Sequence, residues 1–169
     1  MKRLFPVLAI ILRWGISHSN AAEPPSNAAI MDIFVNTNFR QLNRFEQLPK
    51  EVRQNLAMHL VGRATGTGTV VANPDERFNA TDIVDPKYPM RRLMFAGEAP
   101  RAWFVYYEHA GHYHLIIYWA GRVEPVFAGR FVTEFRDGSL ENPPSTIVQL
   151  KERFEAGRVE DDAIENLDW

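Results

Sequence analysis

The sequence predicts an α+β fold, a single domain in which an antiparallel meander sheet of about five strands packs against one or two N-terminal helices and a C-terminal helix. Two observations lead to this prediction. Runs rich in aromatic and β-branched residues alternate with short turns over residues 92–135, which is typical of consecutive antiparallel strands. Apolar residues at helical spacing lie before and after this region, at 39–61 and 146–156.

The N-terminus has the pattern of a secretory signal peptide. A basic pair, Lys2 and Arg3, precedes an apolar run at 4–12, and small residues suit cleavage after Ala21 or Ala22. The run is too short to span a bilayer, so no membrane span is expected after cleavage. A buried N-terminal strand or an uncleaved anchor is the alternative. The expected division is a signal peptide at 1–21, a flexible leader at 22–38, and a single α+β domain with an acidic C-terminal tail at 39–169.

Composition narrows the compartment and the class of partner. The chain has no cysteine, which excludes disulfides and a thiol nucleophile, and its formal net charge of −2 provides no basic field for nucleic acid. Removal of three basic residues and no acid with the signal peptide would change the charge from −2 to −5. An exported protein without cysteine fits a bacterial periplasm better than a eukaryotic secretory route. We therefore expect a periplasmic or secreted protein.

The first part of the expected domain is helical in pattern. Residues 39–48 carry apolar side chains at three-residue spacing, which predicts a helix. Pro49 is well placed as the first residue of a second helix over 50–61, whose stripe includes Val52 and Leu56. Earlier and later segments are less definite. Residues 28–35 fit a helix turn or a strand, 62–69 are Gly-rich and lack the P-loop frame, and 69–72 and 78–84 read as short strands.

The central feature is a predicted hairpin, WFVYYEHAGHYHLIIYW, at residues 103–119. A two-residue loop at Ala110 and Gly111 fixes the register, although alanine is not the preferred residue at the first position of such a turn. Apolar residues occupy both faces away from the turn, so we expect the hairpin to lie centrally with both faces covered. The predicted cross-strand pairs are His109 with His112, Tyr107 with His114, Val105 with Ile116, and Trp103 with Tyr118.

The C-terminal third contains one more strand and a helix. Residues 123–135 alternate in polarity, and Gly129 inside this run suggests a bulge or a bend. Ser145 is the expected cap of a helix over 146–156, which Gly157 ends. Nine acidic and three basic residues follow from position 137 onward, and Asp161 is placed to cap a last short helix in the acidic tail.

Aromatic and histidine side chains near the hairpin are the candidate site. Such residues provide rigid contact area for a protein or small ligand of the cell envelope, which predicts a small binding, inhibitor or immunity-type protein without a cofactor. The alternative is a metal-binding protein or metal-dependent hydrolase that holds zinc or another divalent transition metal on His109, His112 and His114, with His112 and His114 as the central ligands. No catalytic residue is predicted. The ligand- or partner-binding candidates are Trp103, Tyr107, His109, His112, His114 and Tyr118.

Overall fold

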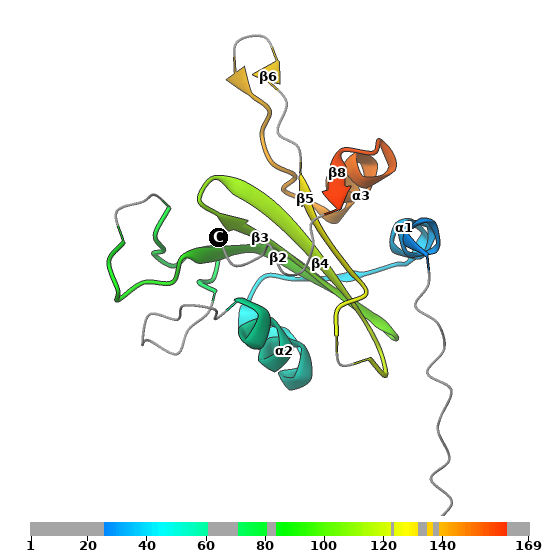
Figure 1. Cartoon of the computed structure of the whole chain (residues 1–169), viewed down its shortest axis with the longest axis horizontal. Helices are drawn as coiled ribbons and strands as arrows, with labels where there is room; N and C mark the ends of the chain where they lie inside the picture. Colours follow the sequence, from blue (N-terminus) through cyan, green and yellow to red (C-terminus); the bar gives the residue numbers. More distant parts are fainter. Residues whose placement is uncertain are drawn as a thin grey trace, which may run out of the picture.

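Six antiparallel strands form one sheet in the order β1-β2-β3-β4-β5-β8 (Figure 1). The order of these strands in the sheet is the same as their order along the chain. The computed structural model describes residues 26–60, 71–80, 84–122, 124–131, 135–136 and 139–161. The strands of this sheet are β1 (Arg40–Leu42), β2 (Arg91–Ala99), β3 (Ala102–His109), β4 (His112–Trp119), β5 (Phe127–Phe131) and β8 (Val159–Asp161). The remaining elements are α1 (Asn27–Asn36), the 3-10 helix η1 (Phe45–Gln47), α2 (Lys50–Leu60), α3 (Ile147–Glu155) and a small pair, β6 (Phe135–Arg136) with β7 (Ser139–Leu140).

The predicted α+β fold is confirmed, with one more strand in the main sheet than expected. The predicted hairpin register is also confirmed. His109 pairs with His112, and every other predicted pair between β3 and β4 is present. Ala110 and Gly111 both have positive φ, 48° and 79°, as a two-residue primed turn requires. The turn therefore sets which side chains share a face, and hence which of them can form a site.

Helices cover both faces of the sheet. Helix α2 packs on one face, against Val105, Ile116 and Ala128 among other sheet residues. Helices α1 and α3 pack on the other face, where the core is largely made of phenylalanine rings. In Figure 1, α2 lies below the sheet, and α1 and α3 lie at its right. The strands β3 and β4 are consequently buried on both sides, as their sequence predicts.

The domain begins earlier than expected. Residues 22–38 were predicted to be a flexible leader, yet Asn27–Asn36 form α1, whose first turn is capped by the hydroxyl of Ser26. Phe34 is 1% exposed, and its ring lies 5.3 Å from that of Phe104 and 5.0 Å from that of Phe154. Burial of an aromatic side chain contributes about 1.5–3 kcal/mol, which anchors the helix. The expected signal peptide at 1–21 lies outside the described residues.

The helix predicted at 39–48 is wrong. This segment forms β1, which pairs with β2, and then the single turn η1. The side chain of Gln47 accepts hydrogen bonds from the backbone N–H groups of Asn43 and Arg44, both at 3.0 Å, and so satisfies donors locally. The second predicted helix is confirmed as α2. Pro49 immediately precedes it, and its carbonyl accepts the first helical bond from Arg53 at 3.0 Å.

The C-terminal third differs from the prediction in two places. Of the strand expected at 123–135, residues Phe127–Phe131 form β5, which keeps a continuous register with β4 in place of a bulge at Gly129; residues 123 and 132–134 lie outside the described residues. Glycine is required there because a Cβ would lie 2.6 Å from Cγ1 of Val159 on β8. The first residues of the expected acidic tail form the edge strand β8, which pairs with β5. Asp161 belongs to this strand, whereas it was expected to cap a helix. The rest of that tail, at 162–169, lies outside the described residues.

Helix α3 agrees with the expected C-terminal helix. Its N-cap is Thr146, one residue beyond the expected Ser145, and Gly157 follows its end with a φ of 67°. Two other expected elements fall largely outside the described residues: the Gly-rich connector at 62–69, and the short strand at 78–84, of which Phe78–Ala80 have no regular structure. The one bulge in the pairing of the main sheet's described strands lies in β2, between Leu93 and Phe95.

Candidate functional site

A groove opens between α2 and the end of the sheet at which β4 turns toward β5. It encloses about 560 Å³, which is within the range of roughly 300–1,000 Å³ that small-molecule sites occupy. Its wall is mostly apolar. The side chains that matter most to it are Val52, Asn55 and Met58 of α2, Trp103 of β3, and Tyr118 and Trp119 of β4.

Helix α2 supplies one wall of the groove. Its buried residues are Val52, Asn55, Leu56 and Leu60, at the three- and four-residue spacing that places side chains on one face of a helix. The three apolar members belong to the core between α2 and the sheet. Asn55 is only 3% exposed, so an amide lies in a stripe that is otherwise hydrocarbon.

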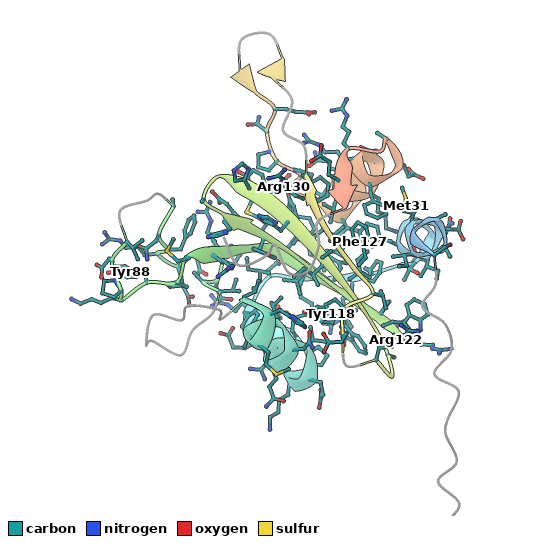
Figure 2. All side chains as sticks on the ribbon, viewed as in Figure 1. Met31, Tyr88, Tyr118, Arg122, Phe127 and Arg130 are labelled. Atoms are coloured by element: carbon teal, nitrogen blue, oxygen red, sulfur yellow. The ribbon has the colours of Figure 1, made fainter. Side chains whose placement is uncertain are left out.

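The sheet supplies the opposite wall. Trp103 and Tyr118 face each other on β3 and β4, so their side chains lie next to each other on one face. Both belong to the core on the α2 side, where Tyr118 is buried and Trp103 is partly buried. Figure 2 shows Tyr118 beside α2, with Arg122 nearby where the sheet ends. Both aromatic residues were predicted as binding candidates, and the structure brings them to the same groove.

Four buried polar atoms of groove residues have no hydrogen-bond partner within the described ranges. They are Nδ2 and Oδ1 of Asn55, Nε1 of Trp103 and the hydroxyl oxygen of Tyr118. A buried donor or acceptor without a partner costs about 1–3 kcal/mol. Because most buried polar groups are paired in folded proteins, several unpaired atoms at one groove require an explanation.

The other two buried asparagines show what this chain does when an amide is structural. Asn79 donates from Nδ2 to the carbonyls of Asp85 at 2.9 Å and Tyr88 at 2.7 Å, and its Oδ1 accepts from the N–H of Asp85 at 3.0 Å. Asn73 accepts from the N–H of Phe45 at 2.8 Å and donates to Glu76 at 3.1 Å. Both amides hold loops in place, in contrast to Asn55.

The four buried, unpaired atoms belong to side chains that are neutral at ordinary pH. Burial raises the pKa of the Tyr118 phenol above its usual value, and the neighbouring Tyr107 and Glu124 raise it further. A phenol in this state donates and accepts hydrogen bonds and does not ionise near neutral pH. The amide of Asn55 and the indole of Trp103 have no charge either. The buried part of the groove wall therefore has no charge on these three side chains.

Solvent-exposed residues also line the groove. Glu51, Gln54 and Arg122 are polar or charged, and Met58 is 66% exposed. The imidazole of His59 lies 2.5 Å from a carboxylate oxygen of Glu124, which joins the last turn of α2 to the segment after β4. This contact is partly open to solvent, and neither of its residues lines the groove.

The predicted histidine cluster lies at the other end of the hairpin. His109 and His114 are buried, at 6% and 7% exposure, whereas His112 is exposed. The ring of His114 stacks on Tyr107 with centroids 5.1 Å apart and planes at 14°. His109 and His114 have ring centroids 6.4 Å apart. These residues continue the layer of the sheet that faces α2, and they do not line the groove.

Burial controls the charge of the two inner histidines. Burial, together with smaller effects of nearby positive charge such as that of Arg91, lowers the pKa of His109 to about 4 and that of His114 to about 3. Arg91 itself donates to the carbonyl of Leu60 at 3.0 Å, at the end of α2. Both imidazoles are neutral at physiological pH. Among the residues that the structure describes, no three His, Asp or Glu side chains come together as a metal site.

The opposite face holds a buried acid and a buried phenol. Glu108 pairs with Arg92 at 2.6 Å, which neutralises its charge. The hydroxyl of Tyr106 has no partner in the described part of the chain, and burial raises its pKa. Neither Glu108 nor Tyr106 lines the groove. An unpaired atom without an adjacent groove gives no reason to expect a ligand, so this face is treated as core.

The structure thus divides the predicted site residues into two groups. Trp103 and Tyr118 line the groove, and Tyr107, His109 and His114 lie in the buried layer toward the hairpin turn, with His112 at the surface. The sequence analysis missed Asn55, Met58 and Trp119 as groove residues. A signal for Asn55 was present, because position 55 follows Val52 by three residues and therefore falls on the apolar stripe.

Comparison with known protein families, curated proteins and solved structures finds no match for this chain. Within the described residues, no helix is both long and apolar enough to cross a membrane.

Proposed function

We propose that this protein binds a small molecule in the groove between α2 and the ends of β3 and β4. The observation that carries the proposal is a mostly apolar groove of about 560 Å³, whose lining includes the aromatic residues Trp103 and Trp119 and the polar residues Glu51, Gln54 and Arg122. Binding sites for small molecules combine an apolar wall with a few polar groups that fix orientation.

Binding is favoured over catalysis by the chemistry of the groups present. The groove wall is mostly apolar, and the buried polar groups of Asn55, Trp103 and Tyr118 are neutral, so the wall offers contact area for a ligand and no charged group in its buried part. The charged groups that line it, Glu51 and Arg122, are exposed to solvent. The earlier prediction of a protein partner, as for an inhibitor or immunity-type protein, stays a prediction.

Ligand binding is tested with N-phenyl-1-naphthylamine, an uncharged dye that fluoresces in apolar surroundings. We expect the full-length protein to bind it with one site, and energy transfer from Trp103 and Trp119 to report its position. The variant Met58→Glu should weaken binding at least fivefold, because it places a charge on the apolar wall. Met58 is 66% exposed, so the substitution should leave the fold intact.

A matched control is available on the opposite face. Val148 of α3 is 64% exposed, and Val148→Glu makes the same chemical change on a helix that does not border the groove. We expect this variant to bind the dye like the unmodified protein. The proposal fails if the dye does not bind, or if Met58→Glu and Val148→Glu behave alike.

Export is a second part of the proposal, supported by the N-terminal pattern of Lys2 and Arg3 before an apolar run. Expression of the full gene in a bacterium should yield protein in the periplasm or medium that starts at residue 22 or 23. Mass spectrometry of the intact protein measures this. Recovery of only uncleaved, intracellular protein would contradict export.

Metal binding at His112 and His114 remains the alternative. Neutral imidazoles are the form that binds zinc, copper or nickel, and burial keeps His114 neutral. Untagged protein is dialysed against each ion, and bound metal is measured beside His112→Ala/His114→Ala. One equivalent of metal that is lost in the double variant would support the alternative. Equal metal content in the two proteins would exclude a site on these residues.

A further inference from the structure

We infer that Met58 is an oxidation site that regulates the groove: peroxide converts its thioether to a sulfoxide, and the groove then binds its ligand more weakly. This inference rests on the proposed function and adds a means of regulating that same site. Three features support it: the place of Met58 in the groove wall, its exposure to solvent, and the polarity that an added oxygen would bring to an apolar surface.

Met58 lies on the face of α2 that borders the groove. Positions 51, 55 and 58 follow one another at four- and three-residue spacing, which places their side chains on one face of the helix, and all three residues line the groove. Met58 is 66% exposed. A small oxidant can therefore approach its side chain from solvent, and a molecule in the groove can contact it.

The other methionines lie elsewhere. The sequence contains five, and one of them, Met1, lies outside the described residues. Met31 and Met94 are partly buried against the core on the α1 and α3 side, and Met90 is half-buried just before β2. None of these three lines the groove. Among the described methionines, Met58 is thus both the most open to an oxidant and the one whose oxidation would change the groove.

Oxidation by hydrogen peroxide needs no further reactant. The thioether sulfur attacks one peroxide oxygen, and an S–O bond forms as the O–O bond breaks. The departing hydroxide takes the remaining proton and leaves as water, so the sulfur is oxidised and the peroxide is reduced. Methionine sulfoxide is polar where methionine is apolar. A wall that includes Val52 and Trp103 would then carry a strong acceptor, which a bound apolar molecule deprives of water, and binding weakens.

The test measures oxidation and binding in the same samples. The full-length protein is treated with dilute hydrogen peroxide, catalase stops the reaction at intervals, and mass spectrometry of tryptic peptides quantifies the sulfoxide at each methionine. Met58 lies in the peptide 54–63, which contains no other methionine. We expect Met58 to oxidise roughly fivefold faster than Met31 and Met94, or more. Saturation with N-phenyl-1-naphthylamine should slow the oxidation of Met58 alone.

Loss of affinity should follow the time course of Met58 oxidation. The Kd of the dye should rise by about threefold or more as the sulfoxide forms, and methionine sulfoxide reductases of both epimer specificities should restore it. Met31→Leu/Met90→Leu/Met94→Leu is the matched control, because it removes only methionines that do not line the groove and changes side-chain volume little. It should bind the dye and respond to peroxide like the unmodified protein.

Equal oxidation rates of Met58, Met31 and Met94 would overturn the inference, and so would unchanged dye affinity once Met58 is fully oxidised. A peroxide response that disappears in the triple variant would also overturn it, because another methionine would then be responsible. The time course in the unmodified protein decides the question even if the triple variant does not fold. Failure of the dye to bind before oxidation would refute the proposed function itself, whereas normal binding without an effect of oxidation would refute only the regulation.

Discussion

Replacing Asn55 by leucine should make the protein more stable. The side chain is 3% exposed, and neither end of its amide has a partner in the described part of the chain. Burial of such an unpaired group costs about 1–3 kcal/mol, which an apolar side chain of similar shape does not incur. Leucine also adds hydrocarbon to a stripe that already contains Val52 and Leu56. Leucine has the same number of side-chain heavy atoms and the same branching as asparagine, so overpacking should be small.

We expect the free energy of unfolding of Asn55→Leu to rise by about 1–2 kcal/mol. For a domain of this size that is roughly 3–6 °C in Tm. Urea denaturation followed by far-UV circular dichroism measures the change, and an unaltered m-value shows that the native state keeps its compactness.

Asn79→Leu is the matched control for this prediction. Its amide is 6% exposed and makes three hydrogen bonds to Asp85 and Tyr88, so the same substitution should lower stability by about 2–4 kcal/mol. The reasoning is refuted if Asn55→Leu is less stable than the unmodified protein. It is refuted equally if the two variants lose similar stability, since Asn55 would then be paired in the free protein.

Two further predictions concern packing and pH. Gly129→Ala should lower stability by about 1–3 kcal/mol in urea denaturation, because a Cβ there would lie 2.6 Å from Val159 and 2.7 Å from the ring of Phe127. Stability should also fall by about 2 kcal/mol for each of His109 and His114 between pH 7 and pH 5. The folded protein holds their pKa near 4 and 3, so below pH 6.5 the unfolded chain binds more protons; His109→Gln/His114→Gln should flatten this dependence.

The central hairpin could be predicted because its information is local. A two-residue loop at Ala110 and Gly111 fixes the register, and strict alternation then assigns each side chain of β3 and β4 to a face. Helix α2 was predicted for a similar reason, since Pro49 and an apolar stripe define it within twelve residues. Short-range patterns of this kind do not depend on the rest of the molecule.

The misplaced elements depend on distant contacts. Residues 40–42 form a strand only because β2, about fifty residues later, provides an edge for them to pair with. Helix α1 is short, and its place in the fold comes from Phe34, which packs between Phe104 and Phe154. Lys151 adds to this by donating from α3 to the carbonyl of Val35 at 2.8 Å, near the end of α1. None of these partners can be read from the local sequence.

The candidate site was half predicted for the same physical reason. Trp103 and Tyr118 follow from the hairpin register, which places them opposite each other far from the turn. The histidines drew attention because imidazole is chemically versatile, yet their place near the turn buries His109 and His114 away from the groove. Asn55 differs from an ordinary polar helix residue because its amide is buried and has no hydrogen-bond partner in the described part of the chain. This difference can be recognised only when the positions of all neighbouring atoms are known.

The two faces of the sheet differ in a way that supports the same assignment. On the α1 and α3 side, rings such as Phe34, Phe95 and Phe104 pack edge to face at 5–6 Å, which is an efficient way to fill a core. Both faces bury polar atoms that have no partner in the described part of the chain, the hydroxyl of Tyr106 on this side and atoms of Asn55 and Tyr118 on the α2 side. The α2 side differs because a mostly apolar groove adjoins its core, so this face offers another molecule a surface that the opposite core fills with its own aromatic rings.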